Sequence, residues 1–210
     1  MATNNGGSTV DLVSNSGETG TVKFDANLVH PTAPPNPPPG SQPPGMRRPV
    51  AGPQPLNVPQ TATLSVPGDE DAITVDFVSG SHQIQPVSRL GRPSIAHATS
   101  AGKVMLAFAG RELPDGPFRA YTARTITDRE ALASEIERVR EYGYARAAGE
   151  REPGLAAIAA PIRSARGELE AIVALQGPSE RFDEAAVESA LPLLLEHAAA
   201  ISRELGWDVD

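Results

Sequence analysis

The segment Ser100-Ala101-Gly102-Lys103 has the residue types best suited to bind an anion. It lies in an alanine-rich stretch that predicts a helix over 97–108, so the small residues fall in the first turns of that helix. Free N–H groups and the helix dipole favour an anion at a helix N-terminus, and small side chains let a ligand approach closely. The alternative is that the small residues only permit tight packing of the helix on a sheet.

Catalytic motifs are not found in the chain. There is no G-x-S-x-G, H-E-x-x-H or G-x-G-x-x-G. The Ser100–Lys103 segment resembles the end of a phosphate-binding loop, but the leading glycine and the preceding strand are missing. We therefore expect a protein that is not an enzyme and that has no cofactor and no metal.

The histidines could supply a metal ligand in one place only. There are four, and they are scattered along the chain: His30, His82, His97 and His197. His97 could ligate a metal together with Glu150 or Glu152. A histidine in an alanine-rich helix is more often a packing residue, and we favour that interpretation.

Composition excludes several functional classes. The 210 residues carry a formal net charge of −8, and no stretch is more basic than Arg47-Arg48, which argues against a large nucleic-acid surface. The absence of cysteine excludes disulfides, thiolate nucleophiles and cysteine-ligated zinc. No apolar run is long enough to span a membrane, and the N-terminus is not a secretory signal. A soluble, cytoplasmic protein is the expectation.

The elements that would position the small residues centre on a hairpin. Two apolar runs of strand length, 155–162 and 169–176, flank a polar turn that contains Gly167. Because both runs are almost wholly apolar, both faces of this hairpin should be covered. A short strand over 144–147 leads into it.

Further strands and helices surround the hairpin. Strand-like segments over 61–66, 72–78 and 83–87 are joined by close turns, which predicts an antiparallel meander. A helix is expected to start at Thr127, with Glu130 completing a capping box, and to end at Gly143. A second long helix over 183–205 carries one apolar stripe and should cover one face of the sheet, with Gly206 as its C-cap.

The first 59 residues differ in composition. Residues 31–59 hold twelve of the twenty-one prolines, which predicts a polyproline-like or disordered linker or, alternatively, a ligand for an aromatic groove. Weakly alternating segments over 9–13 and 21–25 could pair, but an isolated two-stranded hairpin is marginal in water. We thus divide the chain into a disordered proline-rich tail, 1–59, and an α+β domain, 60–210.

From about Gln60 to Trp207 the chain resembles the effector-binding domain of the IclR family of bacterial transcriptional regulators. The motifs that carry the resemblance are H-A-T-x-x-G-K at 97–103, T-x-T-D at 125–128, V-R-x-x-G-Y-A at 139–145, I-A-A-P at 158–161 and G-P-x-x-R at 177–181. The resemblance implies a GAF-like or profilin-like antiparallel sheet flanked by helices. It also implies a small-molecule effector, often a carboxylate or an aromatic acid, and an oligomer whose arrangement responds to binding.

The resemblance also implies which residues bind the effector. They are Ser100, Ala101, Ala147, Leu155, Ala157, Ala174 and Gln176. Family members with small carboxylate effectors typically have Asp, Cys and two Ser at the positions of Ala147, Ala157, Ala174 and Gln176. The alanines and the glutamine here imply a more apolar pocket for a bulkier or aromatic ligand, or a degenerate pocket that binds nothing. Glu150 and Glu152 are either charges at the rim or part of a solvated loop.

The chain departs from the family pattern upstream. The family carries a winged helix-turn-helix before this domain, and residues 1–59 show none. We expect a regulator without its own DNA-binding domain. It would act in a homo-oligomer, in a hetero-oligomer with full-length relatives or through a protein recruited by the tail, unless residues 1–59 are the remnant of a decayed or fused gene. The alternative function is a non-sensing interaction or oligomerisation protein with a vestigial ligand pocket.

Overall fold

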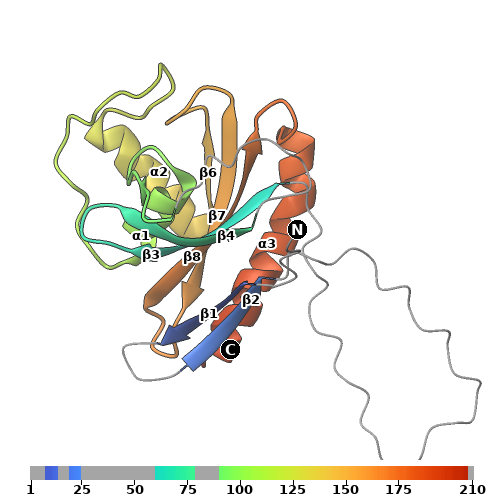
Figure 1. Cartoon of the computed structure of the whole chain (residues 1–210). Helices are drawn as coiled ribbons and strands as arrows, with labels where there is room; N and C mark the ends of the chain where they lie inside the picture. Colours follow the sequence, from blue (N-terminus) through green and yellow to red (C-terminus); the bar gives the residue numbers. More distant parts are fainter. Residues whose placement is uncertain (1–7, 14–18, 25–59, 79–89, 208–210) are drawn as a thin grey trace, which may run out of the picture.

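A six-stranded antiparallel sheet forms the centre of the structure, a computed structural model that describes residues 8–13, 19–24, 60–78 and 90–207. Its strands are β3 (Thr61–Pro67), β4 (Ala72–Val78), β5 (Pro93–Ser94), β6 (Ala145–Ala148), β7 (Leu155–Arg163) and β8 (Leu169–Pro178). Their order across the sheet is β5-β4-β3-β8-β7-β6. The β7–β8 hairpin therefore lies inside the sheet, with a partner on each side (Figure 1).

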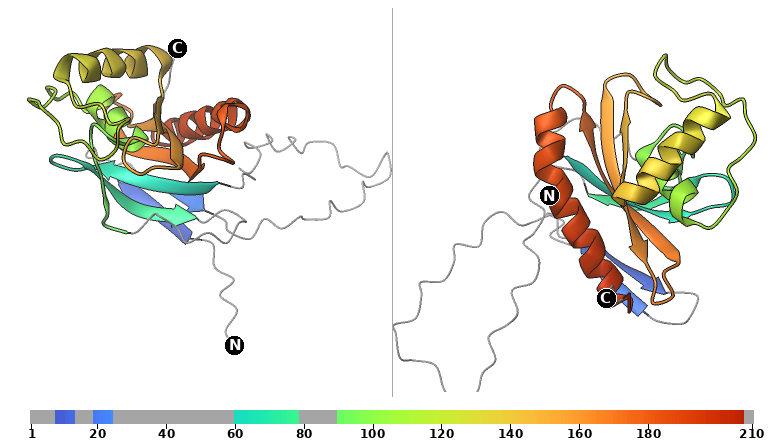
Figure 2. Two further views of the ribbon diagram at one scale, coloured as in Figure 1. Left: turned by 90° about the horizontal axis from the view of Figure 1, so that it is seen from above. Right: turned by 180° about the vertical axis from the view of Figure 1, so that it is seen from behind.

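Helices cover both faces of this sheet. They are α1 (Ser100–Phe108), α2 (Arg129–Tyr142) and α3 (Glu184–Glu204). Helix α3 packs on one face, whereas α1 packs on the other and carries α2 on its outer side (Figures 1 and 2). The predicted α+β architecture, with its antiparallel sheet and flanking helices, is confirmed.

The almost wholly apolar hairpin strands are explained by these two layers. Side chains alternate between the faces of a strand, so a strand covered on both sides is apolar at every position. Ile158 and Leu175 are fully buried in the core under α3, and Ala159 and Ile172 are fully buried in the core under α1. The two-sided core that the apolar runs predict is therefore confirmed.

Two helix starts differ from the predicted ones. Helix α1 begins at Ser100, not near His97, because the Thr99 side chain is the N-cap and accepts a hydrogen bond from the Gly102 amide at 3.0 Å. Helix α2 is capped by Asp128, whose carboxylate accepts from the Ala131 amide at 2.9 Å. The prediction of Thr127 as the cap, paired with Glu130, was wrong by one residue.

The helix ends agree closely with the predicted ones. Gly143 ends α2 in the left-handed region with φ of 75°, as expected for a C-terminal glycine. The C-cap of α3 is Leu205, one residue before the predicted Gly206, because the helix ends with Glu204. Gly206 follows directly and takes the left-handed φ of 84°.

The N-terminal region contains a second, smaller sheet. Strands β1 (Ser8–Val13) and β2 (Thr19–Phe24) form a separate antiparallel pair. They lie where the sequence analysis noted two weakly alternating segments that could pair. The predicted strand over 83–87 and the proline-rich 31–59 lie outside the described residues.

Candidate functional site

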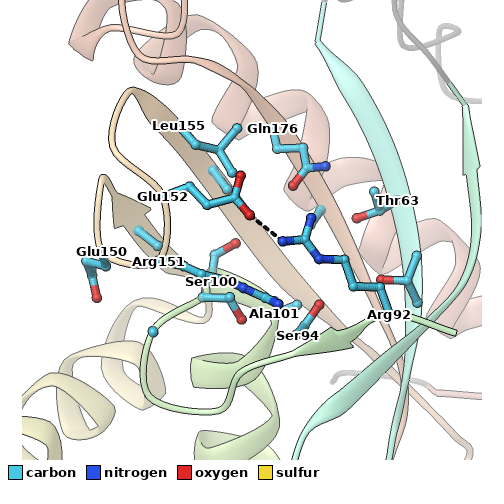
Figure 3. Close-up of a pocket in the computed structure, with 16 residues that line it drawn as sticks. Thr63, Arg92, Ser94, Ser100, Ala101, Glu150, Arg151, Glu152, Leu155 and Gln176 are labelled. Atoms are coloured by element: carbon cyan, nitrogen blue, oxygen red, sulfur yellow. Dashed lines mark hydrogen bonds and ion pairs between the residues drawn. The ribbon is translucent and has the colours of Figure 1, made fainter. Parts of the chain in front are cut away.

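A cavity of about 70 Å³ lies between the start of α1, the sheet and the β6–β7 loop. The structure brings together in its wall all seven positions that the sequence analysis singled out: Ser100, Ala101, Ala147, Leu155, Ala157, Ala174 and Gln176. Nine further residues complete the lining, and several of them are charged: Thr63, Thr74, Arg92, Ser94, Ala98, Thr99, Glu150, Arg151 and Glu152. Figure 3 shows how these side chains converge from separate strands and loops.

The floor of the cavity is made by small side chains on neighbouring strands. Ala157 of β7 pairs with Ala147 of β6 on one side and with Gln176 of β8 on the other. In the next row Ala174 of β8 pairs with Thr63 of β3. Residues that are paired across strands present their side chains on the same face. The sheet therefore concentrates small residues below the start of α1.

The small residues of α1 have two different roles. Ser100 and Ala101 occupy the first two helical positions and line the cavity. The amides at these positions have no acceptor within the helix, because the carbonyl four residues earlier lies before the helix begins. A Cβ at Gly102 would lie 2.4 Å from the Ile95 carbonyl oxygen and 2.5 Å from the Ala96 Cα, so this glycine is needed for close packing. The packing interpretation therefore holds for Gly102, and the anion site at Ser100 and Ala101 stays a prediction.

Two arginines and a glutamate make one side of the cavity polar. Arg92, which precedes β5, forms an ion pair with Glu152 of the β6–β7 loop (Figure 3). Arg151 donates a hydrogen bond to the Pro93 carbonyl. Burial lowers the pKa of Arg151, and the nearby positive charge of Arg92 lowers it further. The expected apolar character is found on the floor, but it does not extend to this side.

A second charged group, the Lys103 cluster, lies behind the cavity wall and consists of Lys103, Glu135, Glu150 and the Arg146 carbonyl. The Lys103 ammonium donates to Glu150 Oε1 at 2.8 Å, to the Arg146 carbonyl at 3.0 Å and to Glu135 Oε1 at 3.1 Å. These three bonds use all three of its donors. Its side chain is only 1% exposed. Lys103 therefore joins α1 to α2 and β6, and is not available to a phosphate.

Glu150 connects the Lys103 cluster to the cavity. Burial raises the pKa of its carboxyl, and this outweighs the lowering effect of Lys103. Burial would also raise the pKa of Glu135, but Lys103 and Arg138 together lower it below its ordinary value. The second carboxylate oxygen of Glu150, Oε2, is buried and has no hydrogen-bond partner among the described residues. This oxygen is a buried acceptor whose donor the described residues do not supply.

His97 is a packing residue. Its ring stacks on Phe118 with a centroid distance of 5.0 Å, and its Nε2 lies 3.0 Å from the Arg119 carbonyl oxygen. Glu150 and Glu152, its suggested co-ligands, are paired with Lys103 and Arg92. Within the described ranges no group of three or more His, Asp or Glu side chains could hold a metal ion.

Sequence reasoning offered Glu150 and Glu152 as possible charges at the rim, where the structure places them, but it missed Arg92 and Arg151. Arg92 and Thr74 belong to segments that only the sheet order brings next to the hairpin, so no local pattern links them to it. Lys103 does carry a signal, because it is the only charged residue in the nine-residue α1 and such a lone charge indicates a buried ion pair. Arg151 lies in a loop between two glycines with positive φ, Gly149 and Gly154.

No helix in the part of the chain that the structure describes is both long and apolar enough to cross a membrane. This result agrees with the lack of a long apolar run in the sequence.

Comparisons with known proteins all point to one family. The family described as "Bacterial transcriptional regulator IclR C-terminal" matches residues 55–203. The regulator KdgR of Escherichia coli K12 is 32% identical over 145 residues, which are 66% of this chain and 55% of KdgR. The chain thus spans about half the length of the curated relatives it matches.

Solved structures of the same family share the fold. IclR of Thermotoga maritima has a TM-score of 0.64 and 31% identity, over 71% of this chain and 62% of that one. A double mutant of the PobR inducer-binding domain from Acinetobacter, in complex with 3-hydroxybenzoic acid, has a TM-score of 0.62 and 27% identity, over 68% of this chain and 87% of that one. The GAF-like fold that the resemblance implied is confirmed by these likenesses.

Proposed function

The chain belongs to the IclR family of bacterial transcriptional regulators through its C-terminal effector-binding domain, and from this premise we propose that it senses a small carboxylate or aromatic acid. Its relatives are transcriptional regulators and not enzymes. Binding would take place in the cavity lined by Ser100, Ala101, Ala157, Ala174 and Gln176. As a regulator of bacterial transcription it would work in the cytoplasm.

The observation that supports an acidic ligand is the presence of two arginines beside an alanine floor. A guanidinium group binds a carboxylate in a planar, two-pronged arrangement, which makes Arg92 the natural partner for the acid group. Ala157 and Ala174 leave the opposite side open to a ring or an alkyl chain. The PobR domain, with its 3-hydroxybenzoic acid, is consistent with such a ligand.

The route from the cavity to transcription is part of the proposal. The lining comes from β3, β4, α1, the β6–β7 loop and the central hairpin, so a ligand would contact most layers of the domain at once. We expect occupancy to bias the arrangement of subunits in a homo-oligomer or in a hetero-oligomer with full-length relatives. The three described helices belong to the effector-binding domain, so DNA contact would fall to another part of the regulator.

One observation favours a second function. The cavity is only about 70 Å³, and Arg92 already has a partner in it. A pocket that has lost its ligand would have both properties. In that case the domain serves as an interaction or oligomerisation module, and no small molecule binds in the cavity.

A thermal-shift screen of the full chain separates the two functions. Its panel would contain small aliphatic acids, aromatic acids and lactones. A ligand at one hundred times its Kd should add about 2.7 kcal/mol of apparent stability. The Ala157→Trp variant should fold but lose the shift, whereas Ala185→Trp, at an exposed position of α3, should keep it. A cooperative melt with no shift for any acid would favour the interaction module.

A further inference from the structure

We propose that Glu152 acts as a built-in competitor of the effector, so that an anionic ligand enters the cavity by displacing Glu152 from Arg92. The inference rests on the proposed sensing function and adds a criterion for which ligands can bind. A ligand with a carboxylate can take over the guanidinium of Arg92, whereas a neutral ligand of the same shape cannot. Figure 3 shows Arg92 extended across the pocket toward Glu152, with Gln176 and Thr63 beside it.

The cavity is small, so an opening of its wall would give a ligand more room. A water molecule needs about 10–15 Å³ of such space, so about 70 Å³ holds only a few waters. Ligand pockets are typically about 300–1,000 Å³. The Arg92–Glu152 pair, which reaches into the cavity, is the natural part to open. Breaking it would enlarge the space and expose a charged partner for the ligand in one step.

The exposure of the charged groups indicates which pair can open. The side chains of Arg92 and Glu152 are 29% and 33% exposed. Those of Lys103 and Glu150 are 1% and 12% exposed. A partly exposed pair contributes little to stability, because water hydrates both ions when they separate. Separating the buried pair would leave two charges without water, so it should stay closed.

Hydrogen bonds fix the main chain of the β6–β7 loop, whereas the Glu152 side chain is held by its partly exposed ion pair with Arg92. Thr125 Oγ1 donates to the Glu150 carbonyl at 2.6 Å, and the Gly149 amide donates to the Leu155 carbonyl at 2.7 Å. The Ser179 amide donates to the Gly154 carbonyl, also at 2.7 Å. The displacement should therefore be a rotation of the Glu152 side chain into solvent, without movement of the loop.

Charge balance favours an exchange of one carboxylate for another. Arg151 lies near Arg92, and the two positive charges repel each other. A site with two cations needs an anion, and Glu152 supplies it when no ligand is bound. When a ligand carboxylate takes that place, Arg92 keeps an anionic partner and solvent hydrates the displaced Glu152 carboxylate. A neutral ligand would either leave the ion pair of Arg92 and Glu152 in place or separate it without supplying a charge in return, and both outcomes weaken binding.

Isothermal titration calorimetry of the full chain with benzoate, pyruvate and benzamide tests the inference. Glu152→Gln removes the competing charge and should bind benzoate about fivefold more tightly than the wild type, which corresponds to about 1 kcal/mol. Glu152→Ala should bind it at least as tightly as Glu152→Gln. Arg92→Met should bind it at least about tenfold more weakly. Benzamide should bind the wild type and Glu152→Gln equally.

A matched control is Glu137→Gln. It removes one carboxylate from the ion pair with Arg140 on the exposed side of α2, so benzoate binding should not change. If the wild type binds benzoate and neither Glu152 variant binds it more tightly, Glu152 is no competitor, although the sensing function stands. If benzoate and pyruvate bind to neither the wild type nor the Glu152 variants, the inference fails, and the wider acid panel of the thermal-shift screen decides whether the sensing function fails with it.

Discussion

Glu150 and Glu152 are two residues apart in one loop, and each forms an ion pair with a cation from a different part of the chain. Glu150 pairs with Lys103 of α1, and its side chain is 12% exposed. Glu152 pairs with Arg92 ahead of β5, and its side chain is 33% exposed. The chemistry of the two pairs is nearly the same, so the difference in their surroundings decides what each can do.

The comparison teaches that burial separates a structural ion pair from an exchangeable one. The Lys103 ammonium uses all three of its donors within the cluster, and taking the cluster apart would leave charges without water. Water reaches both Arg92 and Glu152, so their separation costs little. Glu150 of this loop thus stabilises the wall of the cavity, and Glu152 closes the cavity.

The largest expected effect is that of Lys103→Met. This change leaves Glu135 and Glu150 without their shared cation and should lower the free energy of unfolding by about 3–5 kcal/mol. Chemical denaturation measures it. Arg129→Gln, which removes an exposed partner of Asp115, is the control and should cost no more than about 0.5 kcal/mol. A loss below about 1 kcal/mol for Lys103→Met would mean that the cluster does not hold the fold.

Glu150→Gln should have an intermediate effect of about 1 kcal/mol. The amide oxygen still accepts from Lys103, and Lys103 keeps Glu135, so less is lost than in Lys103→Met. The same denaturation experiment checks this ranking. If Glu150→Gln cost as much as Lys103→Met, the cluster would depend on the charge of Glu150 and not on the ammonium group.

Glu152→Gln should change stability by no more than about 0.5 kcal/mol, since its pair with Arg92 is partly exposed. The comparison with Glu150→Gln is direct because both changes replace a carboxylate by an amide in one loop. Should Glu152→Gln destabilise the fold more than Glu150→Gln, burial would not be the property that separates the two pairs.

The smallest expected effect concerns pH. Burial raises the pKa of Glu150 above 4.5, so the stability it contributes is complete below pH 4.5 and is lost as pH rises through its pKa in the folded state. The stability of the wild type relative to Glu150→Gln should therefore increase as pH falls from 7 toward 4.5. Denaturation curves at several pH values measure this difference.

Glu135 provides the opposite case. Its pKa is lowered, so its contribution is present above pH 4.5 and is lost as pH falls through its pKa in the folded state. The wild type should lose stability relative to Glu135→Gln only below pH 4.5. If the stability difference from the wild type depended on pH in the same way for Glu135→Gln and Glu150→Gln, the opposite pKa shifts of the two glutamates would both be contradicted.

Local patterns in the sequence predicted most of the fold. The apolar runs of the hairpin and the stripe of α3 are set by nearest neighbours, and both elements appear within two residues of their predicted bounds. The starts of α1 and α2 differ from the predicted ones because neighbouring polar residues compete for the cap. At α2 both Thr127 and Asp128 were suitable, and the structure uses Asp128.

The residues of the site also fall into two groups, those that local sequence patterns predict and those that only the strand order brings in. Ala157 and Gln176 lie on the hairpin, so their convergence follows from an element that the sequence predicts well. Arg92 and Thr63 reach the same cavity only through the order of β5, β4 and β3 beside β8. No periodicity encodes that order, so the sequence did not link Arg92 to the cavity.

The cross-strand row Ala147–Ala157–Gln176 gives the cavity floor an unusual freedom to change. Main-chain hydrogen bonds hold the three strands together whatever side chains they carry. A larger residue on one strand can be balanced by a smaller one on the next, which moves the empty space sideways by one strand spacing, about 4.8 Å. Related proteins could thus change their effector through pairs of compensating substitutions. The residues at positions 147, 157 and 176 should then covary among those proteins.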